Sequence, residues 1–197
     1  MHSSLNPSGA MPDIAVRYTL NPGLSRFKVQ ATASGLLSAF AHNPVILIPA
    51  FSGEVRFDPA SLDSAYLRMV IDAGALDVSD DMNDKDREEI RRLMYEEVLD
   101  SGSYPELIYE CSSVTGSSVG QGRFWLTLNG ELTLHGVTRP QPVGATLAVD
   151  HKTLRASGDF SLRQSDYQIK LVSSIGGALK VKDELRCSFN IVAEKSE

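Results

Sequence analysis

The chain has few cysteines and no long hydrophobic run. Its 197 residues include only two cysteines, Cys111 and Cys187, which are too few for a disulfide framework and lack C-x-x-C spacing. Its longest apolar run, Val45–Ile48, has a proline on either side, whereas a membrane helix needs roughly 18 apolar residues. We therefore expect neither a disulfide-rich scaffold nor an integral membrane segment.

Basic residues are also too few to give the chain a positive charge. Lys and Arg number 19 against 25 Asp and Glu, so the formal net charge is −6. This balance argues against a broad phosphate-binding surface and so against nucleic acid as a partner. Hydrophobic residues make up 42% and charged residues 22% of the chain, which is typical of a globular protein.

The first residues lack the features of a signal peptide. Residues 1–13 have neither a basic start nor an apolar middle, and we expect them to form a flexible tail. Residues 14–197 are expected to form a single domain, because a chain of this length can bury roughly 70% of its unfolded surface in one core. The expected location on this chain is the cytoplasm, or the periplasm if an upstream signal has been removed.

Most of the chain alternates between apolar and polar residues, which is typical of β-strands with one buried face. In the last segment the apolar positions from Leu179 to Ile191 share one parity, which predicts a long strand. Asp183 is the exception, and we expect it to lie at a bulge or a rim of the barrel. Similar alternation predicts strands over residues 14–20, 26–33, 51–57, 65–71, 107–111, 143–149 and 153–163. Several of these are longer than the usual five or six residues, which favours a barrel of tilted strands over a sandwich.

The segment Phe124–Leu134 contains Asn129-Gly130, a pair that often forms a two-residue hairpin turn. Phe124 and the four leucines of this segment all have even numbers, so an uninterrupted strand places them on one face. A turn at Asn129-Gly130 would instead pair Leu128 with Glu131. We predict one continuous strand that bends near Gly130.

One segment, at about residues 84–99, has helical periodicity. Asp84 can cap it, and Ile90, Leu93, Met94 and Val98 form a stripe at i, i+3, i+4 and i+8. We expect this stripe to pack as a cap on one end of the barrel. In the alternative interpretation, Ile90, Leu93 and Met94 belong to a lid that opens for a ligand.

A barrel of about eight strands either fills its interior with side chains or encloses one small ligand. Small residues such as Ala31, Gly53 and Ala156 are interspersed with large ones on the expected inner faces, so both alternatives stay open. No Lys or Arg has the inner parity on the clear strands, which favours a neutral, chain-like apolar ligand. The residues expected to line a lumen are Phe27, Val29, Val55, Phe57, Leu67, Met69, Phe124, Leu126, Leu134, Phe160, Leu162, Leu179, Val181, Leu185 and Phe189.

The stretch GELTLHGVTRPQPV, residues 130–143, resembles the signature strand and loop of the YceI-like family of bacterial lipid-binding barrels. Supporting segments in the same order and spacing are YTLNPGLSRFKVQA, FSGEVRFDPASLDSA, MVIDAGALDV, YPELIYECSSV and the last strand. The resemblance covers nearly the whole chain from Tyr18. It implies an all-β fold, an extended, eight-stranded, lipocalin-like antiparallel barrel.

The same resemblance implies non-enzymatic binding, storage or transport of a long neutral lipid, such as a polyisoprenoid or an isoprenoid quinone. The family's usual Asp and His-Ser near the first turn are replaced here by Asn21 and Leu24-Ser25, so a polar anchor for a head group does not carry over. The alternative from another class is a structural or interaction module with a filled barrel, forming a homodimer through exposed residues such as Trp125 or Val70. A weaker alternative is a lipid hydrolase that uses His135.

No motif predicts a metal, a cofactor or a catalytic site. The four histidines, at positions 2, 42, 135 and 151, have neither the i, i+4 spacing of helical metal ligands nor the i, i+2 spacing of ligands on a strand. No P-loop or H-E-x-x-H sequence occurs. We therefore expect no metal site and no cofactor other than a bound lipid, and we expect His135 to order the loop beside Gly136.

The parity assignment predicts different effects for substitutions on the two faces. Phe160→Asp or Leu126→Asp is expected to abolish lipid uptake or folding, because each places a charge on the apolar face. Reversal of the charge at Arg155, on the opposite parity, is expected to leave uptake near normal. Lipid binding by the purified variants checks this, and equal effects on both parities would contradict the face assignment.

Overall fold

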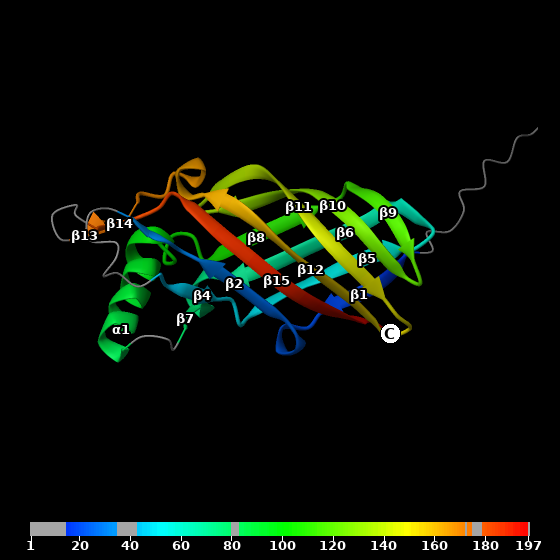
Figure 1. Cartoon of the computed structure of the whole chain (residues 1–197), viewed down its shortest axis with the longest axis horizontal. Helices are drawn as coiled ribbons and strands as arrows, with labels where there is room; N and C mark the ends of the chain where they lie inside the picture. The colour runs from blue at the N-terminus through cyan, green and yellow to red at the C-terminus, as the bar shows by residue number, and fades with distance from the viewer. Residues whose placement is uncertain (1–14, 35–42, 80–82, 172, 175–178, 197) are drawn as a thin grey trace, which may run out of the picture.

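A computed structural model of the chain shows an elongated β-barrel with a helix at one end (Figure 1). The structure describes residues 15–34, 43–79, 83–171, 173–174 and 179–196. The expected tail at residues 1–13 lies outside the described residues, as does His42. No helix among the described segments is long and apolar enough to cross a membrane.

Eight antiparallel strands form the closed wall of the barrel, as the alternating pattern and the resemblance predicted. The first strand pairs with the last, with Tyr18 opposite Lys195 and Leu20 opposite Ala193, and this pairing closes the sheet. In their order around the barrel, the strands are β1 (Val16–Leu20), β5 (Phe51–Asp58), β6 (Ser61–Asp72), β8 (Glu106–Cys111), β10 (Arg123–Leu134), β11 (Val137–Val149), β12 (Thr153–Arg163) and β15 (Glu184–Lys195).

Shorter strands extend this wall. β2 (Arg26–Gln30) continues the edge of β15 and carries β4 (Val45–Leu47) and β7 (Asp77–Val78), while β9 (Val114–Gly120) pairs with β10. A separate small sheet contains β13 (Ser173–Ser174), β14 (Leu179–Val181) and β3 (Ala33–Ser34). Three 3-10 turns, η1 (Pro22–Leu24), η3 (Ala73–Ala75) and η5 (Gln164–Tyr167), complete the described connections.

The prediction of one continuous strand through Asn129-Gly130 is confirmed, because β10 runs from Arg123 to Leu134 without interruption. The turn into β11 instead uses His135 and Gly136, whose φ angles of 50° and 72° are both positive. Two successive positive φ angles suit a tight hairpin turn, and Gly adopts them without a steric penalty. The hairpin turn therefore lies at His135-Gly136 and not at Asn129-Gly130.

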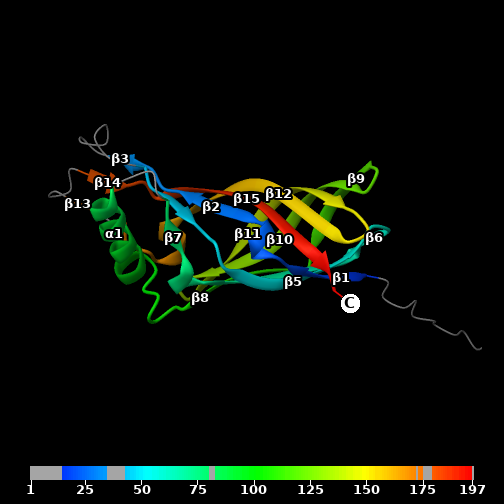
Figure 2. The same ribbon diagram turned by 90° about the horizontal axis from the view of Figure 1, so that it is seen from below.

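The predicted helix is present as α1 (Asp84–Leu93), which widens into a π-helical turn, η4 (Met94–Val98). Asn83 rather than Asp84 caps it, because the Asn83 side chain accepts a hydrogen bond from the Asp86 amide at 3.0 Å. Arg91 forms an ion pair with Asp77 of β7, which ties the helix to the barrel. Figure 2 shows the helix standing at one end of the barrel.

The long C-terminal strand expected from Leu179 onward is divided in the structure, so this part of the prediction is wrong. β14 ends at Val181 and β15 begins at Glu184, with Asp183 between them. The Asp183 carboxylate accepts hydrogen bonds from the amide and hydroxyl of Ser165, at 2.8 and 2.6 Å. The Ser165 hydrogen bonds lower the pKa of Asp183. An ionised carboxylate on the apolar inner face of a strand would be costly to bury, so the strand is interrupted at Asp183.

Gly130 in β10 is needed because the Tyr109 side chain lies against it. A Cβ atom at position 130 would stand 2.5 Å from the Tyr109 ring and 2.8 Å from the Glu110 carbonyl oxygen. Gly130→Ala is therefore expected to destabilise the fold by about 1–3 kcal/mol through overpacking. Urea denaturation measures this, with Gly144→Ala as the matched control, since no atom lies within 4 Å of a Cβ there. Equal losses of stability in the two variants would contradict the assigned contact.

Candidate ligand-binding lumen

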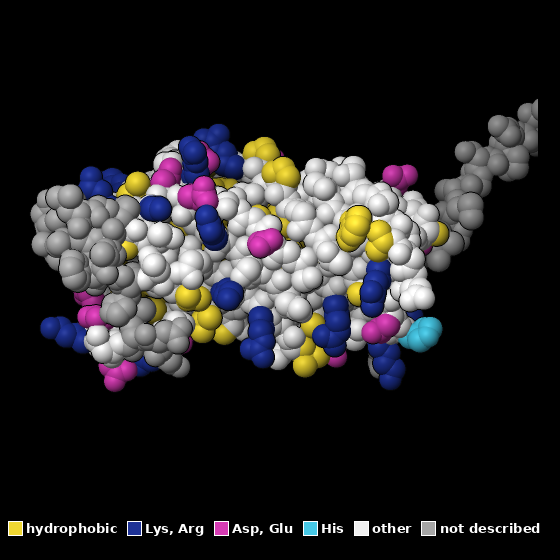
Figure 3. All heavy atoms as spheres, in the orientation of Figure 1, with side chains coloured by type: hydrophobic (Ala, Val, Ile, Leu, Met, Phe, Trp, Pro, Cys, Tyr) yellow, Lys and Arg dark blue, Asp and Glu magenta, His cyan; other side chains and the backbone are white. Residues whose placement is uncertain are grey.

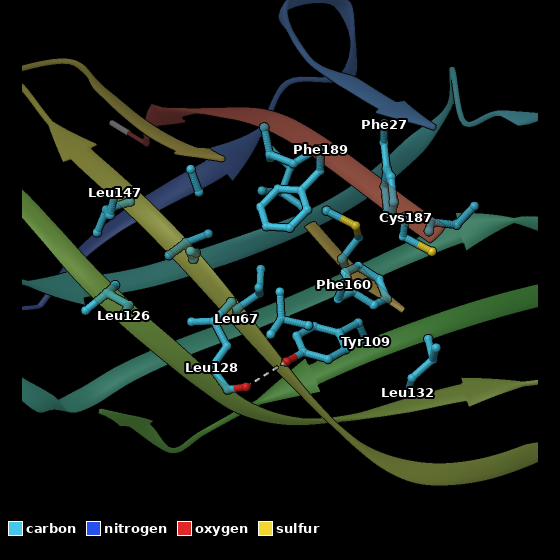
Figure 4. Close-up of a pocket in the computed structure, with 18 of the residues that line it drawn as sticks. Phe27, Leu67, Tyr109, Leu126, Leu128, Leu132, Leu147, Phe160, Cys187 and Phe189 are labelled. Carbon is cyan, nitrogen blue, oxygen red and sulfur yellow. Dashed lines mark hydrogen bonds between the residues drawn. The ribbon is translucent and has the colours of Figure 1, made fainter. Parts of the chain in front are cut away.

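The barrel encloses an apolar cavity of about 170 Å³ (Figure 4). Strands from every side of the wall contribute side chains to it, because the inward positions of each strand have the same parity. The lining includes Leu20, Ile48, Ile71, Leu107, Tyr109, Val114, Leu128, Leu132, Val143, Ala145, Leu147, Leu154, Ala156, Cys187 and Ile191, together with most of the residues expected from the sequence.

The structure brings most of the sequence-predicted lumen residues together around this cavity. They come from β2, β5, β6, β10, β12 and β15, which are far apart in sequence. The predicted residues in the lining are Phe27, Val29, Val55, Phe57, Leu67, Met69, Leu126, Leu134, Phe160, Leu162 and Phe189. Their contact with a ligand stays a prediction.

Three predicted lining residues lie elsewhere, and the side chain of a fourth, Leu179, lies outside the described residues. Phe124 is buried beyond the cavity against Phe57, with ring centroids 5.2 Å apart, so it helps to fill the barrel instead of lining its open space. Val181 pairs with Ala33 in the small separate sheet, and the half-buried Leu185 is not among the lining residues.

The helix residues considered as a lid do not reach the cavity lining. Ile90 and Leu93 are half-buried, and Met94 is buried in the hydrophobic core. The Tyr95 hydroxyl donates a hydrogen bond to the Leu76 carbonyl, which adds a second tie beside the Arg91–Asp77 ion pair. Opening of this helix as a lid stays a prediction.

Several lining residues were missed although their pattern was visible. Leu128 and Leu132 share the even parity of Phe124–Leu134, and Leu107 and Tyr109 share the parity of Cys111. Arg56 could not have been found in this way, because it follows the inward-facing Val55 directly. The register between β5 and β6 shifts between Arg56 and Asp58, and simple alternation fails at such a bulge.

Tyr109 is held rigidly at the wall of the cavity. Its hydroxyl lies 3.2 Å from the Leu128 carbonyl oxygen and 3.1 Å from that of Gln141, and it can donate its proton to either. Burial raises the pKa of Tyr109 well above its usual range, so the phenol stays protonated and remains a donor. The ring therefore presents a fixed apolar surface to the lumen, as Figure 4 shows.

Three phenylalanines form an aromatic cluster in the lining. The ring centroids of Phe27, Phe160 and Phe189 lie 6.2 to 6.4 Å apart in tilted or edge-on arrangements. Such pairs stabilise each other beyond the burial of their area. Their exposed ring surface faces the lumen beside Cys187 in Figure 4. This part of the cavity offers flat, polarisable contacts suited to unsaturated hydrocarbon.

Arg56 is the one charged residue in the described lining, and its guanidinium group lies over an aromatic ring. The guanidinium carbon lies 4.6 Å from the centroid of the Tyr66 ring, within the range of a cation–π contact. Its Nε atom is buried and has no hydrogen-bond partner among the described residues. The rest of the lining is hydrocarbon, aromatic ring and thiol, so the cavity is suited to an uncharged ligand.

The described residues bring together no metal site. They contain no group of three His, Cys, Asp or Glu side chains that could hold an ion. His135 lies in the β10–β11 turn with its ring centroid 4.5 Å from that of Tyr104, and it does not line the cavity. The His135 ring therefore packs at the turn, and the hydrolase interpretation gains no support from its position.

A closed, eight-stranded antiparallel barrel with an apolar lumen defines a class of barrels that can hold one small ligand inside. Within this class, the sequence model of the YceI-like domain matches residues 18–193. The chain belongs to the YceI-like family. The resemblance seen in residues 130–143 is thereby confirmed.

Relatives in Vibrio species share part of the sequence. UPF0312 proteins of Vibrio parahaemolyticus and Vibrio campbellii are 30% identical to the chain over 95 residues, which is 48% of this chain. The match spans 45% of the length of each of these relatives.

Solved structures share the fold over most of the chain. Burkholderia cenocepacia BcnA aligns with a TM-score of 0.64 at 19% identity, covering 88% of this chain and 98% of that protein. A polyisoprenoid binding domain from Saccharophagus degradans also has a TM-score of 0.64, at 12% identity, covering 92% of this chain and 99% of that domain. At these identities the likeness establishes the fold.

Both thiols of the chain are buried and are expected to be unreactive in the folded state. Burial raises the pKa of Cys187 to about 12 and also raises the pKa of Cys111. At pH 8 a thiol with a pKa near 12 is ionised only about once in ten thousand molecules, and the thiolate is the nucleophile. Iodoacetamide at pH 8 is expected to label neither cysteine in native protein and both in urea. Rapid labelling of the native protein would contradict this burial.

Proposed function

We propose that the protein binds a long, neutral, apolar lipid in the barrel lumen and stores or transports it without a chemical reaction. The observation that carries this proposal is the lining itself, which is hydrocarbon and aromatic except for Arg56, the hydroxyl groups of Tyr66 and Tyr109, and the thiol of Cys187. Burial of apolar surface stabilises the binding of a hydrocarbon chain by such a lining, and this binding needs no reactive group. The Saccharophagus degradans domain with the same fold is a polyisoprenoid binding domain, which supports an isoprenoid or isoprenoid quinone as the ligand.

The size of the cavity limits what the ligand-free barrel accommodates. A dry cavity of roughly 150 Å³ can hold a benzene-sized molecule, and this lumen measures about 170 Å³. A longer chain therefore requires side chains of the lining to change rotamer and widen the lumen. Burial of roughly 400 Å² of ligand would contribute on the order of 10 kcal/mol before the costs of ordering and rearrangement. Chain length is expected to set the affinity more than the head group does.

Extraction of the purified protein with organic solvent, followed by mass spectrometry, tests the proposal directly. We expect a stoichiometric isoprenoid, quinone or acyl lipid, with a denatured and refolded sample as the lipid-free control. The refolded protein is then offered polyprenols of increasing length. Absence of lipid in the native extract, together with no binding of any polyprenol after refolding, would leave the filled-barrel module as the better interpretation.

A substitution that fills the lumen is expected to separate ligand binding from folding. Ala145 lines the cavity, so Ala145→Phe places an apolar ring in the space that the ligand needs. We expect polyprenol affinity to fall at least tenfold while the variant still unfolds cooperatively, because the added surface is apolar. Ala148→Phe is the matched control, since Ala148 lies on the same strand with an exposed side chain. Titration of both refolded variants with a polyprenol checks this, and equal affinities would contradict the lumen as the binding site.

A further inference from the structure

The outer face of the barrel carries an exposed tryptophan away from the lumen. Trp125 of β10 is the single tryptophan of the chain, and 65% of its surface is exposed. Its cross-strand neighbours are Ser117 on β9 and Thr146 on β11, two small neutral residues that leave the indole uncovered. Val119 on β9 is also 45% exposed. The positions directly opposite the indole on both neighbouring strands are therefore uncharged.

Two arginines lie on the same outer face as Trp125. Arg123 precedes Trp125 by two residues on β10 and lies opposite Ala148, while Arg155 lies opposite Ala148 from the other side, on β12. Both arginines are exposed. Figure 3 shows Lys and Arg side chains beside exposed hydrophobic side chains on the face that carries β11 and β12. We call Val119, Arg123, Trp125, Ala148 and Arg155 the Trp–Arg patch.

The arginines of this patch differ from most others on the surface, because they take part in none of the ion pairs among the described residues. Arg17 and Arg68 face Glu54 and Glu110 across neighbouring strands, and Arg92 contacts glutamates on the helix. The turn between β11 and β12 contains one acid, Asp150. Its carboxylate accepts hydrogen bonds from the amides of Lys152 and Thr153 and from the Thr153 hydroxyl. These bonds, helped by the charge of Arg155, lower the pKa of Asp150 to about 2.

Charge and shape together identify the kind of partner that the patch fits. The chain has a net charge of −6, but these two arginines form no ion pair among the described residues, so this basic island is complementary to a negatively charged surface. Tryptophan prefers the boundary between water and lipid, where its ring is apolar and its N–H remains hydrated. Arginine beside it can contact phosphate oxygens. A flat strand surface with a projecting indole suits a bilayer better than a peptide, which binds in a groove or along an open edge.

We propose that the Trp–Arg patch docks the barrel onto an anionic lipid bilayer. The indole of Trp125 enters the head-group region, and Arg123 and Arg155 contact lipid phosphates on either side of Ala148. Two basic residues near an anionic leaflet contribute little binding free energy, so this contact is weak, reversible and sensitive to salt. The proposal does not depend on what occupies the lumen.

The single tryptophan makes the test direct. Vesicles of phosphatidylglycerol and phosphatidylcholine are added to the purified protein, and the emission of Trp125 is recorded with vesicles of phosphatidylcholine alone as the comparison. We expect a blue shift and quenching by brominated lipid with the anionic vesicles only, and we expect both to weaken at 0.5 M salt, where screening is stronger, on the order of a 4 Å Debye length. Unchanged emission would overturn the proposal and would favour an acidic protein as the partner of the patch.

Charge reversals on two faces separate docking from general electrostatics. Arg123→Glu with Arg155→Glu is expected to reduce vesicle binding at least about tenfold in a flotation assay, because two attractive charges become repulsive. The matched control, Arg17→Glu with Arg68→Glu, makes the same change in net charge on strands β1 and β6 and is expected to float like the wild type. Equal losses in the two double variants would overturn the assignment to the patch.

A third variant tests the indole itself. Trp125→Ser is expected to weaken flotation several-fold, while Leu24→Ser, at another exposed apolar residue, has no effect. Uptake of a polyprenol delivered from solution is measured in parallel and is expected to be unchanged in all these variants. Loss of vesicle binding with normal uptake supports docking. Normal flotation of Trp125→Ser contradicts it whatever the lumen binds.

Discussion

The pairing of β1 with β15 is the constraint on which the rest of the structure depends. Because it joins the first strand of the wall to the last, every strand turns one face inward and the sheet encloses a volume. Alternation along each strand then separates the side chains into a lumen lining and an outer surface. Ala145 and Ala148 lie three residues apart on β11 and fall on opposite sides of the wall for this reason.

The interior and the exterior of this wall have distinct chemistries. Inside, the contact of Tyr109 with Gly130 and its hydrogen-bonding distance to two carbonyl groups fix this phenol next to β10 and β11, so its ring gives the cavity a rigid apolar surface. Outside, charge is segregated, and arginines such as Arg68 face carboxylates while Arg123 lies beside Trp125. The proposed binding of lipid in the lumen and the proposed docking through the outer patch therefore use opposite faces of the same strands.

Much of the fold and part of the candidate site could be predicted from the sequence. The alternation of apolar and polar residues assigned Phe160 and Phe189 to the lining, because a strand with one buried face has an apolar residue at every second position. The same pattern could not show that Phe124 fills the barrel beyond the cavity, since parity reports the direction of a side chain and not the space in front of it. Val181 was misassigned because the alternation continues across Asp183 although the strand does not.

The sequence by itself determined the class of fold, the continuity of β10, the helix at residues 84–98 and the family, because these follow from local periodicity and motif order. Only the tertiary structure decided the size of the lumen, the contact of Tyr109 with Gly130 and the assembly of Arg123, Trp125 and Arg155 on one outer face. Cavity volume and surface patches depend on the register between strands distant in sequence. That register is set by closure of the whole barrel, which no single segment encodes.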